Sequence, residues 1–341
     1  MNVSQVIEIA EAWVEEEASQ VPGFCGAYLA GSLSQGRKDS SFPAYSDVDI
    51  YVIVKDVSQI PVRKAKRSYK GILVDSEFQD LEEYRSPEVV LASPEYAPSI
   101  VAGRILSDPT GLLSELQQIV ERGYANQTWV QARCQWEKWL VREYLAKIEP
   151  EATCGDMFEH LIWVVLGLGG LVAVAHLRPP TVRKCLVLTQ ELLQTQGRLE
   201  LHEAILQVWG CAHFERGDVE RCLEECITAF NKAVQVIRTP FYGIHRDVYP
   251  YLVEGSREMI DAGHHREAMF WIMLMRSLSH RAIQRDASEK EKRSSQAGLD
   301  KALNELGLGT VAERRSRLQL LRSVREEVFN LADQETKRYP E

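Results

Sequence analysis

The chain has 341 residues, of which 45% are hydrophobic and 26% are charged, and its formal net charge is −9. This length and composition are typical of a folded protein with room for two domains and a large buried core. The acidic balance argues against a general nucleic-acid-binding protein, which would carry a basic face.

The cysteines and the apolar runs favour a cytoplasmic protein without a membrane span. The seven cysteines are odd in number and form no CxxC pair, which suits a reducing compartment. The N-terminal segment carries acids where a signal peptide would carry bases. The longest apolar run, 161–175, is shorter than the roughly 20 residues that cross a bilayer. We therefore expect a cytoplasmic location and no membrane partner.

The first 110 residues alternate between helix and strand patterns. An amphipathic helix is predicted over 3–19. Strands are predicted over 24–30, 47–54, 71–78 and 100–107. The basic segment 61–70 is predicted to begin as a loop, and the proline-bounded segment 87–98 to contain a short helix at most.

Beyond a turn at 108–111, the pattern is helical and no strand is expected. Helices are predicted over 112–123, 126–148, 155–177, 181–196, 199–210, 218–236, 248–262, 264–284, 297–306 and 311–337. The highly charged residues 285–296 predict an exposed and mobile link. The expected fold class is therefore α+β, with a mixed-sheet domain over 1–110 and an all-α domain over 111–341.

The most informative stretch is 27–54, where an apolar strand runs into Gly31-Ser32 and a second strand carries Asp47 and Asp49. Side chains alternate across a strand, so the two aspartates share a face, roughly 7 Å apart. Paired carboxylates repel each other unless a cation holds them, and Mg²⁺ prefers such oxygen ligands. Gly31 lets a backbone approach a ligand closely, and Ser32 offers a hydroxyl and an amide to a phosphate.

This stretch resembles the polymerase-β-like nucleotidyltransferase superfamily, whose signature is Gly-Ser, a spacer, and Asp-apolar-Asp-apolar. The matching residues are Gly31, Ser32, Asp47, Val48, Asp49 and Ile50. Fourteen residues separate Ser32 from Asp47, which makes the spacer longer than is common in the family. The resemblance implies a nucleotidyltransferase-type sheet for residues 1–110.

The resemblance also implies a third acid on a neighbouring strand, on the same face as the first pair. The predicted strand 71–78 offers Asp75 and Glu77, which both lie on its polar face. Asp75 is the preferred candidate, because the family's third acid commonly follows a run of apolar residues, and Glu77 is the alternative.

A catalytic domain followed by a helical domain is similar to the aminoglycoside and related antibiotic nucleotidyltransferases. The implied enzyme moves a nucleoside monophosphate, AMP from ATP or another NTP, to a hydroxyl of a small acceptor such as an aminoglycoside-like antibiotic, and releases pyrophosphate. Asp47, Asp49 and Asp75 would be the catalytic metal ligands for Mg²⁺, with two ions expected. Gly31, Ser32 and Lys184 would bind the nucleotide phosphates.

Several alternatives remain at this point. The general base could be Asp75, Glu77 or an acid of the helical domain such as Glu159. Related enzymes adenylylate a protein partner in the manner of an antitoxin, and a non-catalytic nucleotide-binding protein is a third possibility. We expect a monomer or homodimer whose partners are a nucleotide and a small acceptor, not a nucleic acid.

Overall fold

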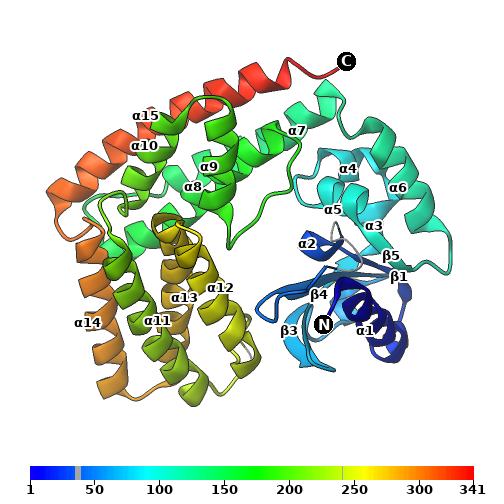
Figure 1. Ribbon diagram of the computed structural model, residues 1–341, viewed down its shortest axis with the longest axis horizontal. Helices are drawn as coiled ribbons and strands as arrows, with labels where there is room; N and C mark the ends of the chain where they lie inside the picture. Colours follow the sequence, from blue (N-terminus) through cyan, green and yellow to red (C-terminus); the bar gives the residue numbers. More distant parts are fainter. Residues whose placement is uncertain (35–39, 240) are drawn as a thin grey trace. The chain divides into compact units, whose positions relative to one another are not determined.

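The computed structural model describes residues 1–34, 40–239 and 241–341, apart from the side chains of Ser32 and Ser34. The chain is α+β, with one five-stranded mixed sheet and a helical C-terminal region (Figure 1). It divides into two compact units. The first unit contains residues 1–132, 245–255 and 341, and the second contains 133–244 and 256–340.

The sheet belongs to the first unit. Its strands are β1 (Phe24–Leu29), β2 (Asp47–Val54), β3 (Lys64–Tyr69), β4 (Ile72–Asp80) and β5 (Arg104–Ser107). Their order is β3-β4-β2-β1-β5, in which β2 and β4 are parallel and every other pair is antiparallel. The strand predicted over 47–54 is confirmed at both ends, and those predicted over 24–30 and 71–78 are confirmed to within two residues.

Successive side chains of β2 point to opposite faces of the sheet, and the two faces contribute to different cores. Val48, Ile50 and Val52 are buried on one face, in the same core as the apolar side of α1 (Val3–Glu16). On the opposite face Ile53 packs into a second core with residues of the short helices α3 (Leu81–Arg85), α4 (Pro87–Ala92) and α5 (Tyr96–Ala102) and of α6 (Leu112–Gly123). Asp47 and Asp49 belong to this second face by parity.

The expectation that 61–70 begins as a loop is confirmed for residues 61–63, but strand β3, which follows at Lys64–Tyr69, was not predicted. A tight hairpin joins β3 to β4, because Tyr69 pairs with Ile72 across the two residues Lys70 and Gly71. Both linking residues have positive φ, 45° and 86°, as a type I′ turn requires. The sequence of β3, KAKRSY, is mostly polar. It therefore has no alternation of apolar and polar residues that would predict a strand.

The region before β5 also differs from expectation. The strand predicted over 100–107 begins only at Arg104, because residues Tyr96–Ala102 form α5. The segment 87–98 contains α4 and the start of α5 instead of one short helix at most. Ser86 caps α4 by accepting a hydrogen bond from the backbone amide of Val89, and Pro87 stands where a helix tolerates proline.

Helices form the rest of the described chain, which contains no strand after Ser107. Their bounds are α7 (Gln127–Leu145), α8 (Cys154–Ala175), α9 (Cys185–Thr195), α10 (Leu199–Trp209), α11 (Arg216–Val236), α12 (Tyr249–Asp261), α13 (His265–Asp286), α14 (Glu289–Glu305) and α15 (Val311–Thr336). Short helical segments are α2 (Gly31–Ser34), η1 (Ala18–Gln20), η2 (Val57–Gln59) and η3 (Arg246–Val248).

Helix α8 is the core helix of the second unit. Among the described helices it alone is long and apolar enough to cross a membrane by length and composition, but 78% of its most apolar window is buried inside the structure. Its apolar residues therefore pack against protein, as the buried side chains from Met157 to Ala175 show.

The expectation of a mobile link over 285–296 is wrong. Helix α13 continues to Asp286, and α14 begins at Glu289 after a short break. Ser288 and Glu291 form a capping box, and Glu291 also pairs with Lys232 of α11 at 2.9 Å. The charges that suggested disorder are therefore the ones that start and anchor this helix.

Candidate metal centre

Three aspartates meet on one face of the sheet. Asp47 and Asp49 lie two residues apart on β2, and Asp75 of the parallel strand β4 is paired with Asp49 in register. One carboxylate oxygen from each lies within 4.8 Å of the others. The predicted strand parity thus places the three carboxylates together, and this cluster could bind a metal ion.

Gly31 lies directly against this cluster. Its φ is +67°, and a Cβ built on it would lie 2.0 Å from Oδ2 of Asp49. The preceding residue, Ala30, donates its backbone N–H to the backbone oxygen of Asp49 at 2.9 Å. The backbone of the glycine turn therefore contacts the carboxylate closely, and no other residue type leaves that space open.

A lysine that the sequence analysis did not identify completes the cluster. Lys66 on β3 is paired in register with Asp75, so Lys66, Asp75 and Asp49 occupy one row across three adjacent strands. Its Nζ lies 2.5 Å from Oδ2 of Asp47 and 3.0 Å from Oδ2 of Asp75. The residue is 6% exposed, so its charge is held inside the site.

An aromatic ring lies against the same lysine. The centroid of the Tyr251 ring is 4.1 Å from Nζ of Lys66, a cation–π contact. Tyr251 comes from the segment 245–255, which belongs to the sheet-containing unit although it is distant in sequence. In the sequence Lys66 is one of several basic residues between 63 and 70, which gave no signal that it would join the aspartates.

The electrostatics of the cluster favour a further cation. Burial raises the pKa of Asp49 above its usual range, and the charges of Asp47 and Asp75 raise it further. Lys66 and Lys64 oppose this effect but do not cancel it. Three carboxylates with one nearby ammonium form a hard-oxygen donor set with excess negative charge, which fits Mg²⁺ or a similar divalent ion.

The alternative third acid, Glu77, has a different partner. It lies on the same face of β4 as Asp75 but pairs in register with Lys64, and the two side chains are 2.6 Å apart. The geometry therefore brings Asp75, and not Glu77, into the oxygen cluster.

The remaining predicted site residues are Ser32, Lys184 and Glu159. The side chain of Ser32 lies outside the described part of the chain. Lys184 belongs to the second unit, next to α9, and pairs there with Glu258 at 2.9 Å. Glu159 of α8 accepts a hydrogen bond from Ser277 at 3.4 Å in the same unit. Their roles in nucleotide binding and proton transfer remain predictions.

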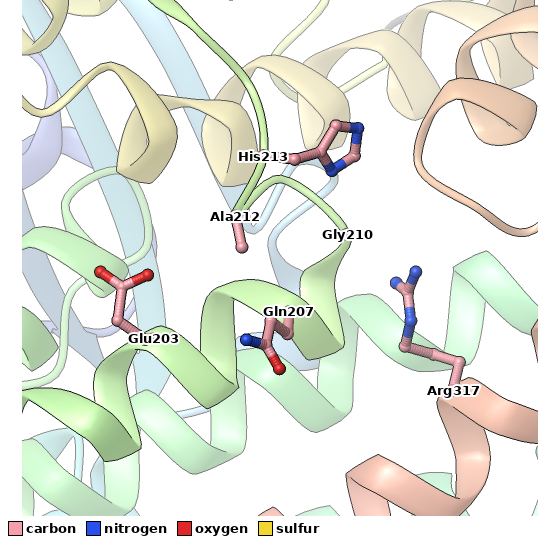
Figure 2. Close-up of a pocket in the computed structure, with 6 residues that line it drawn as sticks. All are labelled: Glu203, Gln207, Gly210, Ala212, His213 and Arg317. Carbon is pink, nitrogen blue, oxygen red and sulfur yellow. The ribbon is translucent and has the colours of Figure 1, made fainter.

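The second unit contains a pocket of about 400 Å³ between α10, the loop after it and α15 (Figure 2). Its lining residues are Glu203, Gln207, Gly210, Ala212, His213 and Arg317. Arg317 donates to the backbone oxygens of Val208 and Leu306, both at 2.8 Å, and Glu203 pairs with Arg266 at 2.7 Å. These charges are used to hold the helices together, so the pocket offers no comparable cluster of chemical groups.

The chain matches no protein-family model and no curated protein. The interpretation of the aspartate cluster therefore depends on the geometry of β2, β4 and the turn at Gly31.

Proposed function

We propose that the protein is a Mg²⁺-dependent nucleotidyltransferase that modifies a hydroxyl group of a small molecule. The observation that carries the proposal is the convergence of Asp47, Asp49 and Asp75 directly against the glycine turn at Gly31. A carboxylate cluster alone would suit many cations. A tight backbone turn beside it, able to approach a phosphate, favours phosphoryl chemistry in particular.

The chain's own groups have distinct tasks in this reaction. Asp47, Asp49 and Asp75 would hold the cation, which when bound supplies charge neutralisation for the triphosphate and for the leaving group. The backbone of the Gly31-Ser32 turn would hold the terminal phosphates. The acceptor oxygen attacks the α-phosphorus, the bond to the bridging oxygen breaks, and pyrophosphate leaves.

The acceptor's proton needs a base within hydrogen-bond reach. Asp75 is the proposed base, because it lies in the carboxylate cluster and Glu77 lies outside it. ATP is the proposed nucleotide, and a hydroxylated cationic compound of the aminoglycoside kind is the proposed acceptor. The net charge of −9 suits such an acceptor.

The test is Mg²⁺-dependent release of pyrophosphate from each NTP against a panel of aminoglycosides and lincosamides. With the right acceptor, Asp49→Asn should lower turnover at least about 1000-fold, because a neutral amide is a poor ligand for a hard divalent ion. Asp56→Asn is the matched control, since Asp56 follows β2 and its carboxylate accepts hydrogen bonds from the backbone and side chain of Ser58 and from the side chain of Gln59.

Circular dichroism should show the same fold for both variants. Turnover of Asp49→Asn near the wild-type rate would contradict the metal assignment. ATP binding without release of pyrophosphate in the presence of any acceptor of the panel would instead favour a protein substrate, which mass spectrometry of adenylylated partners would detect.

A further inference from the structure

Lys66 places a positive charge inside the aspartate cluster. Its ammonium contacts one oxygen of Asp47 and one of Asp75, at 2.5 and 3.0 Å. Charged pairs at these distances are hydrogen-bonded ion pairs. The ammonium therefore occupies a position next to these two oxygens where a metal ion could otherwise bind. Two of the three carboxylates therefore already have a cation.

The lysine is held in this position from several sides. Its side chain is 7% exposed, and the edge strand β3 that carries it is paired with β4 from Lys64 to Tyr69. The Tyr251 ring lies 4.1 Å from the ammonium. A lysine side chain normally extends its ammonium into solvent. The buried ammonium of Lys66 is instead held by its ion pairs with the aspartates and by the Tyr251 ring.

The charges of the cluster limit how many divalent ions it can hold. Three carboxylates are balanced by one ammonium together with one divalent ion. A second divalent ion in the same nucleotide-free cluster would leave two excess positive charges at short range from Lys66, in a half-buried site where such repulsion is poorly screened.

On this basis, and assuming the proposed function, we propose that Lys66 supplies the second positive charge of the nucleotide-free cluster, so that the aspartates hold one divalent ion before the nucleotide binds. In this assignment the nucleotide-free cluster does not hold the pair of ions that the resemblance implied. Lys66 is then a positioning residue, which orients Asp47 and Asp75 and limits the cluster to a single cation.

The test counts bound Mn²⁺ by electron paramagnetic resonance in the nucleotide-free protein. The Asp49→Asn protein is titrated in parallel, and its binding is subtracted to remove ions on the acidic surface. Wild type should bind one Mn²⁺ per chain above this background. Lys66→Met keeps the length of the side chain but removes the charge, and it should either bind a second ion or bind the first at least about tenfold more tightly.

Two further variants make the comparison specific. Lys66→Arg keeps the charge and should retain one ion per chain. Lys64→Met removes the neighbouring lysine of the same strand face, which pairs with Glu77 outside the cluster, and it should bind one ion per chain as wild type does. Thermal unfolding checks that each variant is folded before titration.

The outcomes separate this inference from the proposed function. Two ions in wild type, or identical binding by wild type and Lys66→Met, would overturn the role of Lys66 while leaving the metal centre intact. Wild-type binding no greater than that of Asp49→Asn would overturn both.

Discussion

Gly31 has no room for a side chain, because Oδ2 of Asp49 lies 2.0 Å from where its Cβ would be. Its φ of +67° is also a conformation that other residues adopt at a cost of about 1–2 kcal/mol. Two separate reasons thus require glycine at position 31: the positive φ of the turn, and the lack of space for a Cβ next to the Asp49 carboxylate.

We predict that Gly31→Ala lowers turnover at least about 100-fold, because the methyl group displaces the Asp49 carboxylate from the cluster. Pyrophosphate release and Mn²⁺ affinity are the measurements. Gly111→Ala is the matched control. Gly111 has a similar φ of +77° but nothing within 4 Å of its Cβ position, so this variant should lose stability and keep its activity.

Equal losses of activity in the two alanine variants would show that backbone strain alone, and not contact with Asp49, explains the effect.

At the scale of single residues, the sequence predicted the shared face of Asp47 and Asp49 because the alternation of side chains along a strand is a local property. It did not predict Lys66, since pairing with Asp75 depends on which strand lies next to β4.

At the scale of elements, helices α7 and α8 pack around a buried acid. Glu137 of α7 is 4% exposed, and a Cβ on Gly170 of α8 would lie 2.7 Å from its Oε1. Burial raises the pKa of Glu137 from 4.5 to about 8. The helices therefore enclose a carboxyl group that is neutral in the folded state over a wide range of pH.

This shift predicts how stability depends on pH. From pH 4.5 towards 8 the unfolded state loses the proton of Glu137 while the folded state keeps it, so the free energy of unfolding falls as pH rises, by up to about 1.4 kcal/mol per unit. Glu137→Gln mimics the neutral acid and should reduce this fall, as measured by urea unfolding at about pH 5 and about pH 8.

Glu143→Gln on the same helix is the control, because the side chain of Glu143 is 43% exposed and pairs with Lys147 at 2.8 Å. Its pH dependence should match that of wild type. An unchanged pH dependence in Glu137→Gln would show that the buried carboxyl is ionised without penalty in the folded protein.

Element boundaries were predictable where one side of an element is apolar. The hydrophobic periodicity predicted both ends of α6 and of β2 correctly, because apolar residues recur regularly on one side of each element. It missed β3 and the first half of α14, whose sequences are mostly polar. Edge pairing and ion pairs stabilise those two elements, and neither leaves a hydrophobic period in the sequence.

At the scale of the whole molecule, the sheet-containing unit is discontinuous in sequence. Residues 245–255 return to it after more than a hundred residues of the helical unit. Asp247 from this segment accepts a hydrogen bond from the backbone amide of Ser68 at 2.8 Å, on the open edge of β3. The segment thus covers an edge strand that would otherwise present unpaired amides.

We predict that Asp247→Ala accelerates hydrogen exchange of the Ser68 amide about tenfold, since a hydrogen bond to a charged acceptor is lost. Amides in β2, at the centre of the sheet, should be unaffected. Asp261→Ala removes an acid at the C-terminal end of α12, paired with Arg216, and should leave the exchange of β3 unchanged. Equal exchange of β3 in wild type and Asp247→Ala would mean that the segment does not protect this edge.

The sequence by itself determined the alternation of β2, the shared face of Asp47 and Asp49, and the order of sheet-forming and helical regions. These features follow from local periodicity and turn chemistry, which act within a few residues. Only the tertiary structure decided that Asp75 and not Glu77 joins the cluster, that Lys66 lies between two of the carboxylates, and that Tyr251 contacts it. These depend on strand register and on chain segments far apart in sequence, whose pairing is set by packing of the whole unit.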